Sequence, residues 1–160
     1  MATIQLRSVT DSDLDAVFAQ MRNPESVRMA AFTVEDPDDR QAFDTHIDTL
    51  STAPDVTLRA RTSDNELAGT ISSFTLEGVA EVTCWIGRSL WGRGIASRAL
   101  ELLLREVPAR PIRARAASDN DGSLRVLQKA GFQKVGTEIS YANGRAAVVE
   151  ETVLELTEGI

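Results

Sequence analysis

Residues 85 to 99 read Trp-Ile-Gly-Arg-Ser-Leu-Trp-Gly-Arg-Gly-Ile-Ala-Ser-Arg-Ala, a run that leads from the end of a strand through a glycine loop into a helix. Gly92 and Gly94 allow the backbone to turn tightly and to come close to a ligand. From Ile95 to Val107 the apolar residues have helical spacing, so the free N–H groups of the first helical turn point back at the loop. The positive end of the helix dipole and Arg93 favour a phosphate there. The same glycines are also compatible with a plain strand-to-helix junction.

The loop lacks the motifs of two common phosphate-binding sites. It has no Gly-x-x-x-x-Gly-Lys-Ser/Thr run, and Ser97 stands where the dinucleotide fingerprint would have its third glycine. The pattern therefore argues against ATP and NAD and leaves the diphosphate of another cofactor.

Length and composition predict one globular domain over residues 1–160. The chain has 42% hydrophobic and 26% charged residues, as ordinary soluble proteins do. The formal charge of −7 argues against a nucleic-acid partner or an anionic membrane surface and favours a cationic partner. No apolar run approaches the ~18 residues of a membrane span, so we expect a cytoplasmic protein.

Metal and thiol chemistry find little support in the sequence. The chain has one cysteine and one histidine and no paired ligand spacing, so no metal is expected. Cys84 lies in an apolar strand, where a buried packing role is favoured over a nucleophilic one. His46 lies at the edge of an amphipathic helix marked by Phe43, Ile47 and Leu50, where a catalytic role is the less favoured alternative.

Strands and helices alternate along the chain without a linker or an internal repeat. The predicted strands are Ile4 to Val9, Val56 to Thr62, Leu67 to Phe74, Val79 to Ile86, Ile112 to Ala117, Phe132 to Tyr141 and Ala146 to Leu156. The predicted helices begin near residues 10, 39, 95 and 122 and end near residues 21, 50, 107 and 130. This order predicts an α/β fold with a mixed, mostly antiparallel sheet of about seven strands and about four helices.

Local signals refine this outline. Turn residues at Ser63 to Glu66 and at Leu76 to Gly78 separate three consecutive strands, which predicts an antiparallel meander. Gly131 is placed as the left-handed cap of the helix before it. Asn143-Gly144 predicts a hairpin between the last two strands. From Pro24 to Asp38 the pattern is irregular and partly exposed, as in segments that form substrate lids.

Two motifs resemble the GNAT superfamily of N-acetyltransferases. Trp91-Gly-Arg-Gly-Ile-Ala96 is similar to the family's Gln/Arg-x-x-Gly-x-Gly/Ala pyrophosphate loop, and Asn120-Asp-Gly-Ser123 with Val126-Leu-Gln-Lys-Ala-Gly-Phe132 is similar to its second motif. The spacing of these motifs and the order of strands and helices match the family over nearly the whole chain. Trp91, Ala96 and Asn120 followed by Ser123 resemble the branch that includes ribosomal-protein-alanine N-acetyltransferases.

The resemblance implies acetyl-CoA as the co-substrate. In the family, the strand before the loop and the strand before Asn120 splay apart, and the pantetheine arm of acetyl-CoA lies between them. The implied contacts to this arm are the backbone of Cys84 and Ile86 and the amide of Asn120, which can both donate and accept. Asn120 is also a residue type that opens helices. The pyrophosphate would lie on the loop residues Trp91, Gly92, Arg93, Gly94, Ile95 and Ala96.

The resemblance leaves the acid and the base open. In the ribosomal branch, the serine that matches Ser123 has been considered the acid that protonates the CoA thiolate, although here its hydroxyl could also cap a helix. Leu127 stands where many family members carry a tyrosine acid. One candidate base is Glu81, on the strand before the loop. A related transferase has a glutamate immediately before the Tyr of a Tyr-x-Asn-Gly hairpin, where this chain has Ser140. The second candidate base is Glu138, which lies two residues earlier on the same strand face. Each glutamate is also compatible with a solvated strand position.

The missing strong base predicts the kind of amine that accepts the acetyl group. Deprotonating a lysine-type amine of pKa ~10.4 at pH 7 costs roughly 4.6 kcal/mol, whereas an α-amine of pKa ~7.8 costs roughly 1 kcal/mol. The site is therefore predicted to acetylate a protein N-terminal α-amine or a small-molecule amine by direct attack in a ternary complex. The alternative is a non-catalytic acyl-CoA-binding or protein-docking module of the same fold. A monomer or a homodimer is expected.

Overall fold

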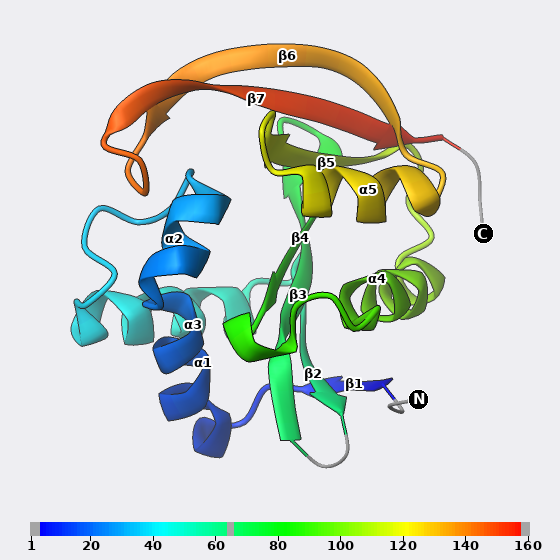
Figure 1. Ribbon diagram of the computed structural model, residues 1–160. Helices are drawn as coiled ribbons and strands as arrows, with labels where there is room; N and C mark the ends of the chain where they lie inside the picture. Colours follow the sequence, from blue (N-terminus) through cyan, green and yellow to red (C-terminus); the bar gives the residue numbers. More distant parts are fainter. Residues whose placement is uncertain (1–3, 64–65, 158–160) are drawn as a thin grey trace.

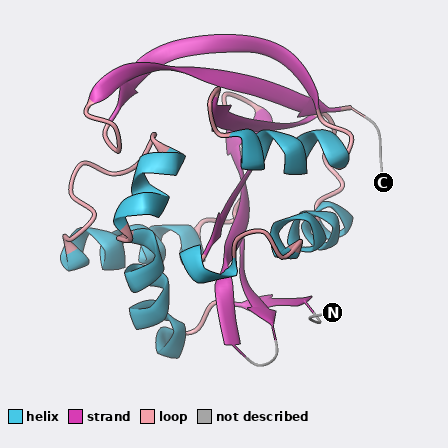
Figure 2. Ribbon diagram, in the orientation of Figure 1, coloured by secondary structure: helices cyan, strands magenta, loops and turns pink. Residues whose placement is uncertain are grey.

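The computed structural model describes residues 4–63 and 66–157 and consists of a seven-stranded sheet with helices on both faces (Figure 1). The strands are β1 (Ile4–Ser8), β2 (Thr57–Ser63), β3 (Glu66–Leu76), β4 (Val79–Ile86), β5 (Ile112–Ala117), β6 (Gln133–Ala142) and β7 (Ala147–Leu156). The helices are α1 (Leu14–Met21), α2 (Pro24–Ala30), α3 (Arg40–Thr52), α4 (Ile95–Glu106) and α5 (Asp121–Lys129), with 3-10 turns at Asp11–Asp13 and Arg88–Leu90. Figures 1 and 2 show α1, α2 and α3 on one side of the central strands, and α4 and α5 on the other.

The centre of the sheet opens between β4 and β5. The strand order is β1-β2-β3-β4-β5-β7-β6, and every neighbouring pair is antiparallel except β4 with β5. These parallel strands pair only at Ala80 with Ile112, Glu81 with Arg113 and Val82 with Ala114. Beyond these pairs, β4 continues to Ile86 and β5 to Ala117 without pairing with each other. We call this opening the fork, and its two prongs are residues 83–86 and 115–117.

Helix α4 covers one face of the sheet next to the fork. Its buried side chains recur at helical spacing, at Ile95, Ala99, Leu100, Leu103 and Leu104. They belong to the same core as Ile71, Val82 and Leu154 of the sheet. Burial of each aliphatic side chain contributes about 1.5–3 kcal/mol. The stripe begins at the first residue of α4, so it fixes the helix start and the glycine loop before it against the sheet.

The predicted fold class is confirmed, including the mixed sheet, the meander of β2, β3 and β4, and the order of the strands along the chain. Gly131 has the positive φ of a left-handed cap, +104°. The turn predicted between β2 and β3 includes Asp64 and Asn65, which lie outside the described residues. Among the helices of residues 4–63 and 66–157, none has the length and apolar character that crossing a membrane requires.

The prediction of an irregular segment from Pro24 onward is wrong for its first part, which forms α2 and raises the number of α-helices in residues 4–63 and 66–157 to five. Asn23 caps this helix, because its Oδ1 accepts the N–H of Ser26 at 3.1 Å. Pro24 occupies the first helical turn, where its missing N–H costs nothing. The Asn-Pro pair therefore both ends α1 and begins α2. A helix of seven residues is too short for hydrophobic periodicity to identify it.

The predicted hairpin connects β6 and β7, but Gly144 serves a different purpose from the one that the Asn-Gly signal suggests. The loop between the paired residues Ala142 and Ala147 has a positive φ at Ala146, +50°, and none at Gly144. Instead, the tip of the hairpin contacts the end of α2, where the N–H of Gly144 donates to the carbonyl of Ala31 at 2.8 Å. A Cβ on Gly144 would overlap the carbonyl oxygen of Val27. Only glycine leaves room for the backbone of the hairpin tip to lie this close to the backbone of α2.

We expect Gly144→Ala to lower the free energy of unfolding by about 1–3 kcal/mol, the usual cost of forcing a group into a filled space. The added methyl would push the hairpin tip away from α2. Gly136→Ala is the matched control on β6, because a Cβ at Gly136 meets nothing within 4 Å. Denaturant unfolding of both variants checks this expectation, and equal stabilities would show that the contact between the hairpin tip and α2 is not constraining.

Candidate active site

The glycine loop presents backbone N–H groups at the start of α4. Gly92 and Gly94 have φ values of +81° and +74°, which L side chains rarely adopt. The first intrahelical bond runs from the N–H of Arg98 to the carbonyl of Gly94, at 3.2 Å, so the N–H groups of residues 95–97 take no part in helix bonding. A Cβ on either glycine would meet nothing within 4 Å. The loop therefore combines unused donors with open space above the backbone, which suits an anion.

Trp91 connects the glycine loop to α2. Its indole Nε1 donates to the carbonyl of Ile86 at 3.1 Å, and the guanidinium of Arg88 lies 4.5 Å from the centre of its ring. Arg88 in turn contacts Glu25 of α2, with Nε 2.7 Å from Oε2. A stacked arginine with a carboxylate partner holds the indole in one orientation.

The opposite prong of the fork leads into Asn120, which caps α5. Its Oδ1 accepts the N–H of Ser123 at 3.2 Å, and its Nδ2 donates to the carbonyl of Met29 at 3.3 Å. The alternative in which the Ser123 hydroxyl caps the helix is therefore wrong, because Asn120 caps α5. The Ser123 hydroxyl is half-buried and makes no hydrogen bond within the described part of the chain. It is available to another group.

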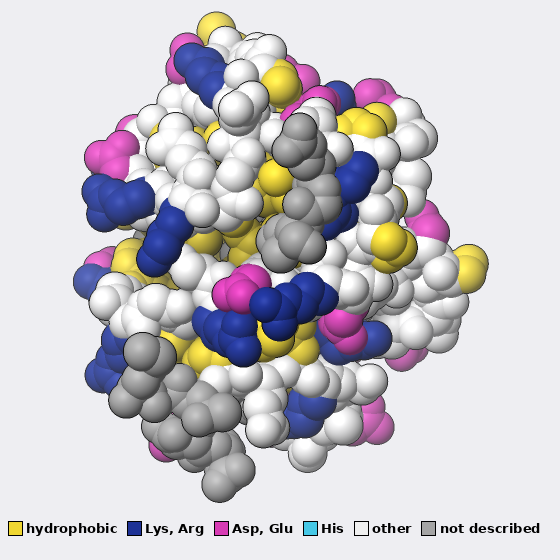
Figure 3. All heavy atoms as spheres, turned by 90° about the vertical axis from the view of Figure 1, so that its right-hand side faces the viewer, with side chains coloured by type: hydrophobic (Ala, Val, Ile, Leu, Met, Phe, Trp, Pro, Cys, Tyr) yellow, Lys and Arg dark blue, Asp and Glu magenta, His cyan; other side chains and the backbone are white. Residues whose placement is uncertain are grey.

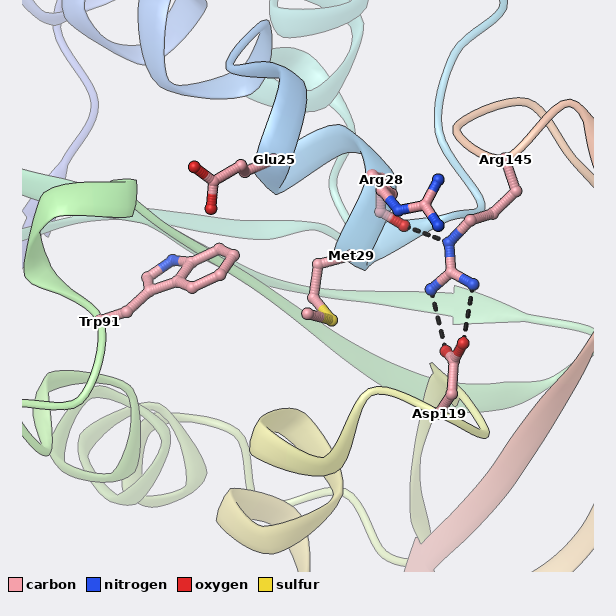
Figure 4. A pocket seen from close by; sticks show the side chains of 6 residues that line it. All are labelled: Glu25, Arg28, Met29, Trp91, Asp119 and Arg145. Carbon is pink, nitrogen blue, oxygen red and sulfur yellow. Dashed lines mark hydrogen bonds and ion pairs between the residues drawn. The ribbon is translucent and has the colours of Figure 1, made fainter.

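A pocket of about 220 Å³ lies at the mouth of the fork (Figure 4). Trp91 follows one prong and Asp119 follows the other, while α2 and the β6–β7 hairpin complete the wall. The lining residues are Glu25, Arg28, Met29, Trp91, Asp119 and Arg145. Figure 4 shows the Met29 side chain in the space between Trp91 and the Asp119–Arg145 pair.

Asp119 is held by Arg145 in a bidentate ion pair, with distances of 2.8 and 2.9 Å. The hydrogen bond from Arg145 lowers the pKa of Asp119, and burial opposes this shift only in part. Arg145 also donates to the carbonyl of Arg28 in α2. Asp119 is therefore a structural carboxylate that fixes the hairpin tip to the β5–α5 turn, and it is poorly suited to accept a proton.

The two candidate bases meet on one arginine that the sequence analysis did not identify. Arg115 Nε lies 2.9 Å from Oε1 of Glu81, and Arg115 Nη1 lies 2.7 Å from Oε2 of Glu138. Glu151 is a third carboxylate near Nη1, at 3.7 Å. The side chain of Glu81 is 6% exposed, whereas that of Glu138 is 57% exposed. The position of Arg115, a charged residue inside an apolar strand, was the available signal that it must have a buried partner.

The predicted burial of Cys84 is wrong, because the side chain is exposed. Cys84 lies on the β4 prong, where it pairs with Ile71 of β3 but has no β5 residue beside it. Successive side chains alternate across a strand, so Cys84 is on the same face as Val82 and α4. His46 lies on the exposed side of α3 and takes no part in the pocket at the fork.

The face that carries α4 shows several Lys and Arg side chains grouped around its middle, with Asp and Glu among them (Figure 3). Arg98 and Arg105 of α4 are both ion-paired with Glu101, at 3.1 and 2.8 Å. Arg93 of the glycine loop is exposed. The formal charge of −7 is thus an average over an uneven surface.

Comparison with known proteins gives a consistent result. Residues 3–133 match the acetyltransferase (GNAT) domain family. A probable N-acetyltransferase of Bacillus subtilis, YjcK, is 39% identical over 82 residues. The matched stretch covers 46% of this chain and 45% of that relative, so it spans less than half of either.

Solved structures with the same fold include two complexes with coenzyme A. RimL, a ribosomal L7/L12 alpha-N-protein acetyltransferase, superposes with a TM-score of 0.76 and 22% identity over 94% of this chain and 93% of that chain. Spermidine N-acetyltransferase from Vibrio cholerae, in complex with CoA and spermine, superposes with a TM-score of 0.78 and 16% identity over 95% of each chain. At these identities the likeness concerns the fold alone.

Proposed function

The chain belongs to the GNAT acetyltransferase family, and on this premise we propose that it transfers the acetyl group of acetyl-CoA to a weakly basic primary amine in a ternary complex. The observation that carries the proposal is the fork. Its prongs lead to the glycine loop on one side and to Asn120 on the other, with the pocket at its mouth. A cofactor arm that lies between the prongs would bring its far end to the pocket.

The residues of the fork fit acetyl-CoA. The N–H groups of residues 95–97 and the open space over Gly92 and Gly94 suit the pyrophosphate. At Cys84 and Ile86, β4 pairs with β3 but not with β5, so the edge of the strand that faces the fork suits the amides of the pantetheine arm, which can both donate and accept. Asn120 Nδ2 has a second hydrogen beyond the one given to Met29, so it can bind the arm and still cap α5. Bound acetyl-CoA would supply the acetyl group as a thioester.

The chemistry requires a neutral amine, a route for its proton and a proton for sulfur. The amine nitrogen forms a bond with the thioester carbonyl carbon, and the carbon–sulfur bond breaks. A neutral amine gives up one proton and the departing thiolate takes up one, so no net proton is released; an amine that arrives protonated first loses one further proton to solvent. We assign the amine's proton to Glu81 through water, with Glu138 as the alternative. The half-buried Ser123 hydroxyl would protonate the departing sulfur and be reprotonated from solvent.

The acceptor is proposed to be a protein N-terminal α-amine or a small-molecule amine of similar basicity. Both candidate glutamates are ion-paired with Arg115, and no histidine is among the described residues that line the pocket. An α-amine needs roughly 3.6 kcal/mol less help at pH 7 than a lysine-type amine does. RimL and spermidine N-acetyltransferase have the same fold, and their names record a protein α-amine acceptor and a polyamine acceptor respectively.

The acceptor class is tested with two peptides of one sequence, one with a free α-amine and an acetylated lysine and the other with the reverse pattern. We expect kcat/KM at pH 7 to be at least about tenfold higher for the free α-amine, within the energy difference between the two amines. Release of CoA is the measurement. A preference for the free lysine would mean that a stronger base is present. Binding of acetyl-CoA without release for any amine would favour a non-catalytic acyl-CoA-binding module.

The cofactor loop is tested with Gly94→Val. Valine strongly disfavours the φ of +74°, so the loop should open and its affinity for acetyl-CoA should fall by at least about tenfold. Gly78→Val is the matched control. Gly78 has a φ of +80° and equally empty surroundings, but it lies in the turn between β3 and β4. Calorimetric affinities that fall equally in both variants would contradict the assignment of the loop.

Cys84 offers a direct footprint of the cofactor arm, since it is the one cysteine of the chain and is exposed on the β4 prong. We expect saturating acetyl-CoA to slow its alkylation at least about tenfold, because the arm would cover this prong. Intact-mass spectrometry follows the reaction, and Cys84→Ser verifies the site. Unchanged alkylation in the saturated protein would place the cofactor away from β4.

A further inference from the structure

The charged groups around Arg115 connect four strands at the base of the fork. Arg115 lies on β5, and its carboxylate partners lie on β4, β6 and β7. Only β4 and β7 are direct neighbours of β5, and β4 is held by just three backbone pairs. The Arg115–Glu81 pair therefore adds a side-chain connection where the backbone connection ends.

The register places this pair at the point where the strands separate. Val82 with Ala114 is the last backbone pair, so Arg115 is the first β5 residue beyond it and Glu81 is one residue before it. The guanidinium reaches back diagonally to Glu81, at 2.9 Å. An ion pair in this position restricts the side-chain rotation of Glu81.

One carboxylate oxygen of Glu81 remains available. Oε1 accepts the Nε–H of Arg115, and Oε2 has no hydrogen-bond partner among residues 4–63 and 66–157. Because Glu81 is 4% exposed, few orientations of its carboxylate are open to it. The free oxygen can receive a proton from a water or an amine that reaches the fork.

We infer that Arg115 is the positioning residue of the acetyl transfer: it holds Oε1 of Glu81 and so orients the carboxylate, leaving Oε2 to accept the proton of the acceptor amine through water. This inference rests on the proposed function. Arg115 itself remains protonated and exchanges no proton.

Other charged side chains near Glu81 and Arg115 also contribute to the local charge. Arg113, the register partner of Glu81, is bonded to Glu155 at 2.6 Å, so its charge is compensated. Glu151 lies behind Arg115, and burial raises its pKa despite the nearby guanidinium. Helix α2, which packs against β5, contributes Glu25 and Arg28 only at the pocket. Arg115 is thus the cation in direct contact with Glu81.

The test is Arg115→Met, with kcat/KM measured against pH. Without the guanidinium, a buried carboxylate has lost its counter-charge and its neutral form is favoured. Only the ionised form accepts the proton. As the pH is lowered, the activity of Arg115→Met should therefore begin to fall at a higher pH than that of the unaltered protein. We expect the acid limb of the profile to move up by at least about one pH unit, as loss of a close opposite charge usually causes. Affinity for acetyl-CoA by calorimetry should change less than about twofold, within the change expected where no contact is lost.

Three further variants separate positioning from a structural role. Arg113→Met removes a similar ion pair on the same face of β5 and should leave the acid limb in place. Arg115→Lys keeps the charge and should retain the wild-type limb while kcat falls. Glu138→Gln removes the charge of the exposed partner, so Arg115 has one fewer carboxylate to compensate besides Glu81. The acid limb of the pH profile should then move to lower pH. If Arg115→Met does not fold, the other two variants still give distinct and measurable expectations: an unmoved acid limb with a lower kcat in Arg115→Lys, and an acid limb at lower pH in Glu138→Gln.

Carbon-detected NMR of the glutamate carboxyls provides a readout in the free protein. The titration of Glu81 should move to higher pH in Arg115→Met and remain in place in Arg113→Met. An acid limb or a Glu81 titration that does not move in Arg115→Met would overturn the inference while the proposed function stands. Loss of the acid limb in Glu138→Gln would assign the base to Glu138, and this result would also overturn the inference about Arg115. Absence of acetyl transfer by the unaltered protein to every amine would overturn the proposed function and this inference together.

Discussion

The three backbone pairs between β4 and β5 are the constraint on which the rest of the molecule depends. A parallel pair needs a long crossover, and here the crossover contains both the glycine loop and α4. Because pairing stops at Val82 and Ala114, the ends of β4 and β5 have no neighbouring strand on the side that faces the fork. A longer pairing would close the sheet and remove the pocket.

Much of this arrangement can be predicted from the sequence, because it depends on local patterns. The period-two runs give β4 and β5 with their observed bounds, and the apolar stripe of α4 fixes the start of the helix after Gly94. The positive φ values of Gly92 and Gly94 follow from the need for a tight turn. The opening between the strands, by contrast, was accessible only through the resemblance to a family, because no single segment encodes it.

The parts that could not be predicted depend on contacts between distant segments. Arg115 obtains its partners from three other strands, and their order in the sheet is not written in any local pattern. The exposure of Cys84 follows from the end of pairing with β5, whereas its apolar neighbours in sequence indicate burial. α2 depends on the cap by Asn23, and it packs under the hairpin tip through Gly144. In each case a local signal was outweighed by tertiary context.

The pocket wall has a consequence for synthesis of the protein. Its residues come from α2 near one end of the described chain, from the loops after β4 and β5 in the middle, and from Arg145 near the other end. Contacts this far apart in sequence form late, because chain closure must precede them. A nascent chain therefore has its glycine loop before the wall of the pocket is complete. That wall closes only when the last hairpin has been made and has brought Arg145 to Asp119.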